Sequence, residues 1–240
     1  MNWSIATVVD VLAETHRTAS IVLRVPGWPG HRAGQHVDVR LTAEDGYQAQ
    51  RSYSIASAPE DDTLMLTVER LDDGEVSSYL AGELSAGDEL ELRGPIGGYF
   101  VWDGPFGGPL MLIGGGSGIV PLRAMLRHRI ARAGAVPVRL LYSARTLSEV
   151  IYHDELLAAA REPGVDIRLT LTREQPDGWD GYDRRIDRDL VADAGFAAAD
   201  RPLVYVCGPT AFVEVAADAL VSLGHEPGRI RTERFGPTGR

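Results

Sequence analysis

Short runs rich in strand-forming residues recur through residues 3–102, and turn sequences separate them. In one run Val37, Val39 and Leu41 alternate with Asp38 and Arg40, which is the period of a half-buried strand. The expected strands are Ser4–Val11, Ser20–Val25, His36–Leu41, Arg51–Ala56, Leu64–Arg70 and Glu89–Leu92, with one short helix at Val76–Leu84. Many short strands at this spacing predict an antiparallel barrel or a sandwich.

The pattern changes after the glycine- and proline-rich residues 94–109, which read as a domain linker. Apolar strand-like runs now alternate with helical periodicity, and this predicts a doubly wound parallel sheet with helices on both faces. Strands are expected at Leu110–Ile113, Val138–Tyr142, Asp166–Thr172, Leu203–Cys207 and Arg229–Phe235, and helices after Gly118 and at Ser148–Arg161, Asp187–Ala194 and Thr210–Leu223. We therefore expect two domains, a β-barrel over residues 1–103 and an α/β domain over residues 104–240.

The composition excludes several kinds of binding and catalytic site. The chain of 240 residues has a net charge of −10, which disfavours nucleic acid as a partner. All its basic residues are arginine, which excludes a Schiff-base lysine or the lysine of a P-loop. A single cysteine, Cys207, forms no internal disulfide and holds no iron–sulfur cluster, which needs about four thiolates. The histidines have no metal-ligand spacing, and we expect no metal centre.

The stretch Leu110–Pro121 runs from an apolar strand into the glycine-rich turn Gly114–Gly118 and then into a helix. A helix start with free N–H groups suits a phosphate, although such a turn can also be purely structural. Ligands of an open α/β sheet gather at the carboxyl ends of its strands. The sequences Ser143–Arg145, Thr172–Glu174 and Cys207–Thr210 are expected at the same edge as the glycine-rich turn.

Arg51-Ser52-Tyr53-Ser54 lies on an expected strand of the first domain. An arginine fork binds phosphate in a bidentate way, and a tyrosine ring stacks on a flat heterocycle. Alternation sends Arg51 and Tyr53 to one face of the strand and Ser52 and Ser54 to the other. The alternative from spacing alone is an ordinary exposed strand face.

Three motifs together resemble the ferredoxin–NADP reductase family. Arg51–Ser54 matches its Arg-x-Tyr-Ser flavin signature, and residues 115–121 match its Gly-x-Gly-x-x-Pro nucleotide loop. Cys207-Gly-Pro-Thr-Ala-Phe212 matches its Cys-Gly-Pro motif. The motifs occur in the family's order and span nearly the whole chain. The nearest resemblance is to stand-alone reductase modules that serve oxygenases.

For the flavin, the resemblance implies that Arg51 binds the phosphate, Tyr53 packs against the isoalloxazine or ribityl chain, and Ser54 hydrogen-bonds the ring. Gly74-Glu-Val-Ser-Ser78 resembles the family's second flavin segment, whose Val76, Ser77 and Ser78 would offer groups at a helix start. The alternative is an ordinary serine-capped helix. The flavin is expected to be FAD, with FMN the weaker alternative.

For the nicotinamide cofactor, the resemblance implies a pyrophosphate on the glycine-rich turn and Cys207 beside the nicotinamide ring. Glu233-Arg-Phe235 resembles the family's C-terminal segment, with Glu233 near the site of transfer and Phe235 near the flavin. For Cys207 and Phe235 the alternative is plain core packing. Arginines near the strand ends favour NADPH over NADH, without deciding between them. The expected binding set is Gly115, Gly116, Ser117, Gly118, Pro121, Ser143, Arg145, Thr172, Arg173, Cys207, Gly208, Pro209 and Thr210.

The resemblance implies an NAD(P)H-dependent flavoprotein reductase, with Ser54, Cys207 and Glu233 as catalytic residues. Electrons would pass singly from bound FAD to a separate ferredoxin, flavodoxin or oxygenase component. Arg123, Arg127, Arg129 and Arg132 form either a basic face for docking it or, as is more common, a merely solvated helix face. The alternatives are a flavin-free dehydrogenase, a free-flavin reductase and a non-catalytic redox sensor. The chain shows no signal peptide and no membrane span, so a cytoplasmic location is expected.

Overall fold

The computed structural model describes residues 2–43, 45–104, 107–132 and 134–236. The chain divides into two compact units. The first contains residues 1–103 together with residues 123–128, and the second contains residues 104–122 and 129–240. Each unit is described by itself below.

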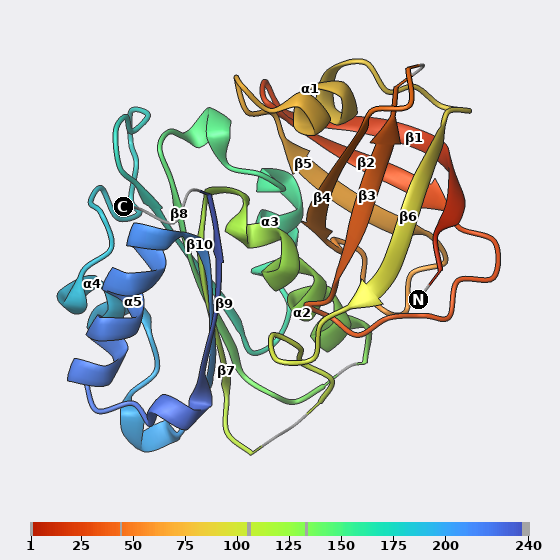
Figure 1. Cartoon of the computed structure of the whole chain (residues 1–240). Helices are drawn as coiled ribbons and strands as arrows, with labels where there is room; N and C mark the ends of the chain where they lie inside the picture. Colours follow the sequence, from red (N-terminus) through yellow and green to blue (C-terminus); the bar gives the residue numbers. More distant parts are fainter. Residues whose placement is uncertain (1, 44, 105–106, 133, 237–240) are drawn as a thin grey trace. The chain divides into compact units, whose positions relative to one another are not determined.

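The first unit is built on a six-stranded antiparallel sheet with the order β4-β3-β6-β1-β2-β5 (Figure 1). An isolated bridge between Ile55 and Leu66 joins the two edges, so the sheet closes into a barrel. Its strands are β1 (Ser4–Thr15), β2 (Thr18–Arg24), β3 (His36–Thr42), β4 (Gln48–Ser54), β5 (Leu64–Glu69) and β6 (Glu89–Ile96). The antiparallel barrel expected from the sequence is confirmed.

Alternating apolar positions of these strands fill the barrel. Val37 and Val39 are fully buried in one core cluster with Leu66 and Leu90, whereas the next residue, Arg40, is only half-buried. Helix α1 (Glu75–Gly82) packs on this cluster through Val76 and Leu80. The helix therefore presents its first turn, residues 75–78, from a fixed position on the barrel.

The middle of helix α2 (Ile119–Ala131) groups with this unit. Arg123 is buried and donates to the Ala56 carbonyl at 2.9 Å, and Arg127 pairs with Asp61 at 2.7 Å. Arg129, in the second unit, is also buried and donates to the carbonyls of Val136 and Pro163. Main-chain carbonyls or a carboxylate therefore occupy the guanidinium groups of three of the four arginines expected on a docking face, and only Arg132 is exposed, so the helix does not offer the expected basic face.

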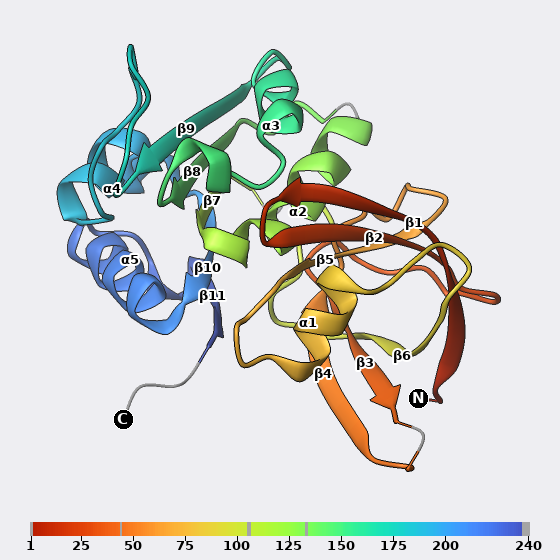
Figure 2. The ribbon, with the colours of Figure 1, turned by 90° about the horizontal axis from the view of Figure 1, so that it is seen from above.

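The second unit contains a five-stranded parallel sheet with the order β11-β10-β7-β8-β9. Its strands are β7 (Leu110–Gly115), β8 (Val138–Ala144), β9 (Val165–Leu171), β10 (Leu203–Pro209) and β11 (Ile230–Phe235). Every residue of the central strand β7 is buried, which explains its unbroken apolar sequence. Helix α3 (His153–Ala159) lies on one face, while α4 (Arg188–Ala194) and α5 (Thr210–Ser222) cover the other (Figure 2). The doubly wound sheet is confirmed.

One expected helix is shorter than its periodicity indicated. Residues 148–161 were expected to be one helix, but a short 3-10 turn (Leu147–Glu149) precedes α3, which begins only at His153. Tyr152 between them has a left-handed backbone, with φ of 61°, which interrupts the helix. The Ile151 amide instead donates to the Tyr142 hydroxyl at 3.3 Å.

Within the described ranges, no helix combines the length and the apolar composition that a membrane crossing requires.

Candidate cofactor sites

The glycine-rich turn lies at the carboxyl end of β7. Gly116–Gly118 forms a 3-10 turn whose preceding residue, Gly115, supplies no side-chain cap, and α2 follows directly with Pro121 in its first turn. Gly116 has φ of 55°, a left-handed conformation that favours glycine. A Cβ on Gly118 would lie 2.2 Å from the Cys207 carbonyl oxygen, so this approach also requires glycine. The turn is therefore built for close packing, with its N–H groups left uncapped by side chains.

Cys207 is buried at the end of β10, between two strands. In the parallel register it lies opposite Gly114 on one side and Glu233 on the other. Burial raises the pKa of the Cys207 thiol well above its usual value, and the charge of Glu233 raises it further. The thiol is therefore protonated at neutral pH and is a poor nucleophile.

Glu233 carries an unusual carboxyl group. Its Oε2 atom is buried and has no hydrogen-bond partner among the described residues. Burial raises the pKa of Glu233 to about 7. The carboxyl can therefore hold or release a proton near neutral pH, at a sheet edge where polar groups were expected to meet.

The segment after β10 completes this edge. Pro209 is the N-cap of α5 and pairs in register with Phe235, and α5 begins at Thr210 without a side-chain cap. The Thr210 Oγ1 atom is buried and lacks a partner within the part of the chain that the structure describes. Two unpartnered buried oxygens, from Thr210 and Glu233, thus belong to neighbouring strand ends.

The ends of β8 and β9 meet as expected. The Arg173 amide donates to the Arg145 carbonyl at 2.9 Å, and the Thr172 amide donates to the Ala144 carbonyl at 3.0 Å. Ser143 lies opposite Gly115 in the register of β7 and β8. The side chains of Arg145 and Arg173 are exposed, and Arg145 is 3.9 Å from Glu149. Two arginines therefore stand on adjacent strand ends of the same sheet edge.

In the first unit, β4 carries the Arg51–Ser54 motif. Arg51 is exposed, and within the described residues its side chain donates only to its neighbour's carbonyl, that of Gln50, at 2.7 Å. Tyr53 packs against the barrel core, and burial raises the pKa of its hydroxyl to about 12. The Ser52 hydroxyl donates to Asp38 at 2.6 Å, whereas that of Ser54 has no partner among the described residues. The motif thus offers an available guanidinium, a fixed ring and an available hydroxyl.

The second expected flavin segment forms the start of α1. A Cβ on Gly74, the N-cap, would lie 2.2 Å from the Ser77 hydroxyl, and no side chain caps the helix. Val76 is buried in the core. The Ser77 hydroxyl accepts from the Leu71 amide and donates to the Gly74 carbonyl, both at 3.2 Å, and Ser78 donates to the Leu71 carbonyl. The amides of Gly74 and Ser78 donate to the carbonyls of Leu71 and Gly74, so the main-chain N–H groups of residues 75–77 are the ones left for an anion.

Two family models divide the chain in the same order as the sequence motifs. Residues 6–101 match the oxidoreductase FAD-binding domain, and residues 112–218 match the oxidoreductase NAD-binding domain. A solved cytochrome P450 reductase from Amycolatopsis has a TM-score of 0.85 and 30% identity, and the match covers 99% of this chain and 71% of that one. The chain belongs to the ferredoxin–NADP reductase-like family.

Other members of this family support the assignment. The chain is 32% identical to the glycine betaine monooxygenase reductase subunit of Chromohalobacter salexigens over 236 residues, which is 96% of this chain and 63% of that relative. The chain thus spans less than two thirds of that relative's length. The solved FAD/NAD-binding domain of a Vibrio cholerae nitric oxide dioxygenase superposes with a TM-score of 0.86 at 26% identity, covering 98% of this chain and 99% of that one.

The residues present fit the two cofactors of this family. Both expected anion sites are helix starts with glycine at the cap and no capping side chain, at Gly74 and Gly115. In each turn a Cβ would collide, at Gly74 with the Ser77 hydroxyl and at Gly118 with a carbonyl. Such helix starts bind phosphate groups through main-chain N–H donors.

Sequence reasoning assigned no role to Phe212. Its ring lies where a Cβ on Gly115 or on Gly208 would come within 2.9 Å and 2.8 Å of it, respectively. Phe212 therefore fills the space that both glycines leave, and it fixes the glycine-rich turn against the end of β10. The sequence did contain a signal for this role. Glycines stand at two expected strand ends, and an aromatic residue follows the second of them in the first turn of the next helix. Of the tail after Phe235, residues 237–240 lie outside the described residues.

Proposed function

We propose that this chain is an NAD(P)H-dependent flavoprotein reductase that takes hydride from NAD(P)H onto bound FAD and passes electrons singly to a separate acceptor protein. A bound flavin accepts two electrons as hydride from reduced nicotinamide and releases them one at a time. The observation that carries the proposal is the unpartnered, readily titrated carboxyl of Glu233 beside Cys207 and the glycine-rich turn.

On the flavin side, we assign phosphate binding to Arg51 and to the N–H groups of residues 75–77 at the start of α1. The exposed guanidinium of Arg51 and the uncapped helix start support this assignment. Tyr53 is fixed by the barrel core and would hold the flavin by packing. Ser54 has an uncommitted hydroxyl and would orient the ring by a hydrogen bond, whereas the bond from Ser52 to Asp38 gives Ser52 an indirect, structural part.

On the nicotinamide side, we assign the pyrophosphate to the N–H groups of Gly115–Gly118 and to Thr210. The absence of a side-chain cap at that turn and the unpartnered Thr210 hydroxyl support this. Cys207 would act through its shape and not as a nucleophile, because its thiol stays protonated. Gly208 and Pro209 would keep the end of β10 narrow. Glu233 would hold a proton at Oε2 and give up or take up that proton as the charge near it changes.

We propose NADPH as the preferred donor. Exposed Arg145 and Arg173 on adjacent strand ends support recognition of the 2′-phosphate, with Ser143 and Thr172 beside them. NADH lacks that phosphate, so it would gain nothing from these two guanidinium groups.

The acceptor is proposed to be a ferredoxin, a flavodoxin or an oxygenase component. Names of the relatives support this, since one is the reductase subunit of a monooxygenase. We further propose that residues 1–103 form the flavin domain and residues 104–240 the NAD(P) domain, with the 123–128 part of α2 packing on the former. The cytoplasmic location expected from the sequence stays a prediction, which cell fractionation tests.

The visible spectrum of the purified full chain tests the proposal. After incubation with FAD and gel filtration, the protein should be yellow, and anaerobic NADPH should bleach it. A protein that retains no flavin would contradict the proposal and favour a flavin-free dehydrogenase. Flavin that washes out yet is reduced in solution would favour a free-flavin reductase, and bound flavin that neither nicotinamide bleaches would favour a sensor.

A further inference from the structure

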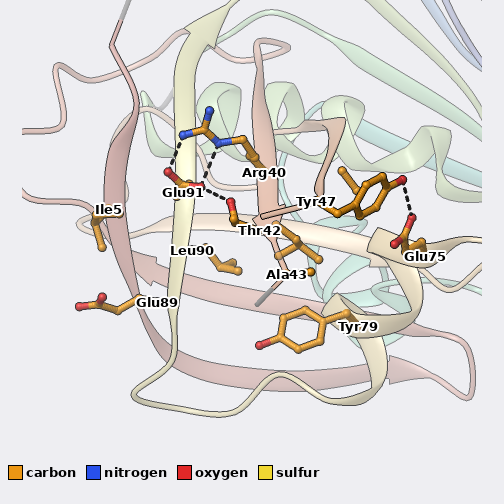
Figure 3. Close-up of a pocket in the computed structure, with 12 residues that line it drawn as sticks. Ile5, Arg40, Thr42, Ala43, Tyr47, Glu75, Tyr79, Glu89, Leu90 and Glu91 are labelled. Atoms are coloured by element: carbon orange, nitrogen blue, oxygen red, sulfur yellow. Dashed lines mark hydrogen bonds and ion pairs between the residues drawn. The ribbon is translucent and has the colours of Figure 1, made fainter. Parts of the chain in front are cut away.

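A pocket of about 530 Å³ lies at one end of the barrel in the first unit (Figure 3). It is lined by residues from β1, β3, β4, β6 and α1 and from the turn between β3 and β4. Of its lining residues, Glu75 alone lies in a segment proposed above for a cofactor, and it was assigned there through its main-chain N–H and not its side chain. The lining residues are Ile5, Arg40, Leu41, Thr42, Ala43, Tyr47, Ala49, Glu75, Tyr79, Glu89, Leu90 and Glu91.

The floor of the pocket is apolar, and two of the large apolar side chains that line the pocket are unusually exposed. Ala49 and Leu90 belong to the barrel core, and Tyr79 of α1 packs against that core. Ile5 and Tyr47 are 49% and 55% exposed, which is high for large apolar side chains. Exposed apolar groups that border a hollow mark a place where a partner's side chain can be buried.

The walls of the pocket carry net negative charge. Its arginine, Arg40, is fully engaged: it forms two hydrogen bonds with Glu91, at 2.9 and 2.5 Å, and lies 4.2 Å from the centre of the Trp3 ring. The guanidinium lowers the pKa of Glu91, which stays ionised. Glu75 accepts a hydrogen bond from Tyr47 at 3.3 Å, and the exposed Glu89 has no partner among the described residues. Two carboxylates are thus left uncompensated around an apolar floor.

This charge excludes a phosphate-bearing ligand and favours a cation. The surrounding sequence extends the same sign, since residues 69–91 contain eight acidic residues and one arginine, a net charge of −7. Residues 1–103 contain 17 acidic residues and seven arginines, whereas residues 104–240 contain 17 of each. The whole net charge of −10 therefore belongs to the barrel part of the sequence. Negative charge spread over this much of the chain attracts a macromolecule with a basic surface, whereas a small cation would need only the charges of the pocket.

We propose that this pocket is a docking site for a basic partner protein, which inserts an apolar or aromatic side chain flanked by arginine or lysine. The inserted side chain contacts Leu90, Ile5 and the tyrosine rings, and the flanking cations face Glu75 and Glu89. Aromatic and arginine residues supply most of the binding energy in protein interfaces, so this combination is a common anchor. The site does not depend on hydride transfer.

The probe is a fluorescein-labelled peptide, Lys-Lys-Trp-Lys-Lys, titrated into the full chain while anisotropy is followed. Two comparison peptides replace the tryptophan with glycine or all four lysines with glutamate. The tryptophan–lysine peptide should bind about tenfold more tightly than either comparison peptide and should weaken as salt is raised. Equal binding of the three peptides, or binding that salt does not weaken, would overturn the proposal.

Two charge reversals locate the binding. Glu89→Lys should weaken the tryptophan–lysine peptide about fivefold, whereas Asp62→Lys, an exposed acidic position of the same unit outside the pocket, should change it less than about twofold. Equal effects of the two variants would overturn the assignment to this pocket. Methyl NMR of the unmodified chain tests the site without relying on the folding of any variant. The methyl signals of Ile5, Leu41 and Leu90 should shift when the peptide is added, and shifts confined to other methyl groups would contradict the site. If tetramethylammonium displaced the peptide at a concentration similar to that of the peptide, the occupant of the pocket would be a small cation and not a protein partner.

Discussion

Cys207 and Glu233 face each other across the parallel pairing of β10 and β11, and the charge of Glu233 raises the pKa of the Cys207 thiol. One residue is a protonated thiol and the other a carboxyl whose pKa is about 7. Because the Glu233 Oε2 atom has no partner among the described residues, the folded protein ionises this carboxyl only at a cost. Stability and function should both respond to its titration.

Glu233→Gln tests that cost. Below pH 4.5, the ordinary pKa of this carboxyl, it is protonated in the folded and the unfolded chain alike. Between pH 4.5 and about 7 the unfolded chain ionises it while the folded chain does not, so stability falls, and above pH 7 the loss is constant. The variant should therefore have a Tm several degrees higher than that of the wild type at pH 8 and the same Tm at pH 4.5, measured by calorimetry. A gain of the same size at both pH values would show that Glu233 does not titrate as described.

Gly118→Ala tests the closeness of the glycine-rich turn to β10. The added Cβ would meet the Cys207 carbonyl at 2.2 Å, so the turn must shift. We expect nicotinamide binding to weaken by about tenfold or more while flavin binding is retained, as measured by titration of each cofactor. Gly228→Ala, whose Cβ meets only ordinary contacts in the same unit, should leave both unchanged. Equal losses in the two variants would contradict the role of the turn.

Arg145→Ala and Arg173→Ala test the choice of nicotinamide. A lost charge-assisted bond to a phosphate costs about 1.5–3 kcal/mol, so each variant should raise KM for NADPH about tenfold or more and leave that for NADH nearly constant. Steady-state kinetics with both cofactors checks this. Arg188→Ala, an exposed arginine at the start of α4, serves as the control and should affect neither. Equal loss for both cofactors would remove these residues from 2′-phosphate recognition.

Ser54→Ala tests the orienting hydroxyl on β4. The hydroxyl has no protein partner among the described residues, so its removal should leave the barrel and the flavin content intact. Reduction by NADPH should slow by about tenfold or more, because one orienting hydrogen bond is lost. Rapid-mixing kinetics measures the rate, and Ser4→Ala, an exposed serine on β1, is the matched control. An unchanged rate would remove Ser54 from the mechanism.

Much of the fold could be predicted from the sequence because its periodicities are strong. Alternation at Val37 and Val39 identified a barrel strand, and the apolar run of β7 identified a strand buried on both faces. The error at residues 148–161 arose because the left-handed backbone of Tyr152 and its neighbour's bond to Tyr142 depend on tertiary contacts. Helical periodicity contains no information about such an interruption.

The candidate sites were predicted less completely. Motifs identified the strand ends and the α1 turn, but not which side chains have other partners. Ser52 and Ser77 hold neighbouring protein groups, and Arg123 is buried against a carbonyl, so their polarity in the sequence was misleading. The place of Phe212 behind two glycines and the raised pKa of Glu233 require the register of three strands, which the linear sequence does not specify.

The central claim is that this chain transfers hydride from a nicotinamide to its own flavin. The most direct measurement is anaerobic rapid mixing of the FAD-loaded full chain with NADPH that carries deuterium in place of the transferred hydrogen, followed at the flavin absorbance. The account predicts bleaching in a single turnover that is slower with the deuterated donor than with ordinary NADPH. A flavin spectrum that neither NADPH nor NADH changes would contradict the account.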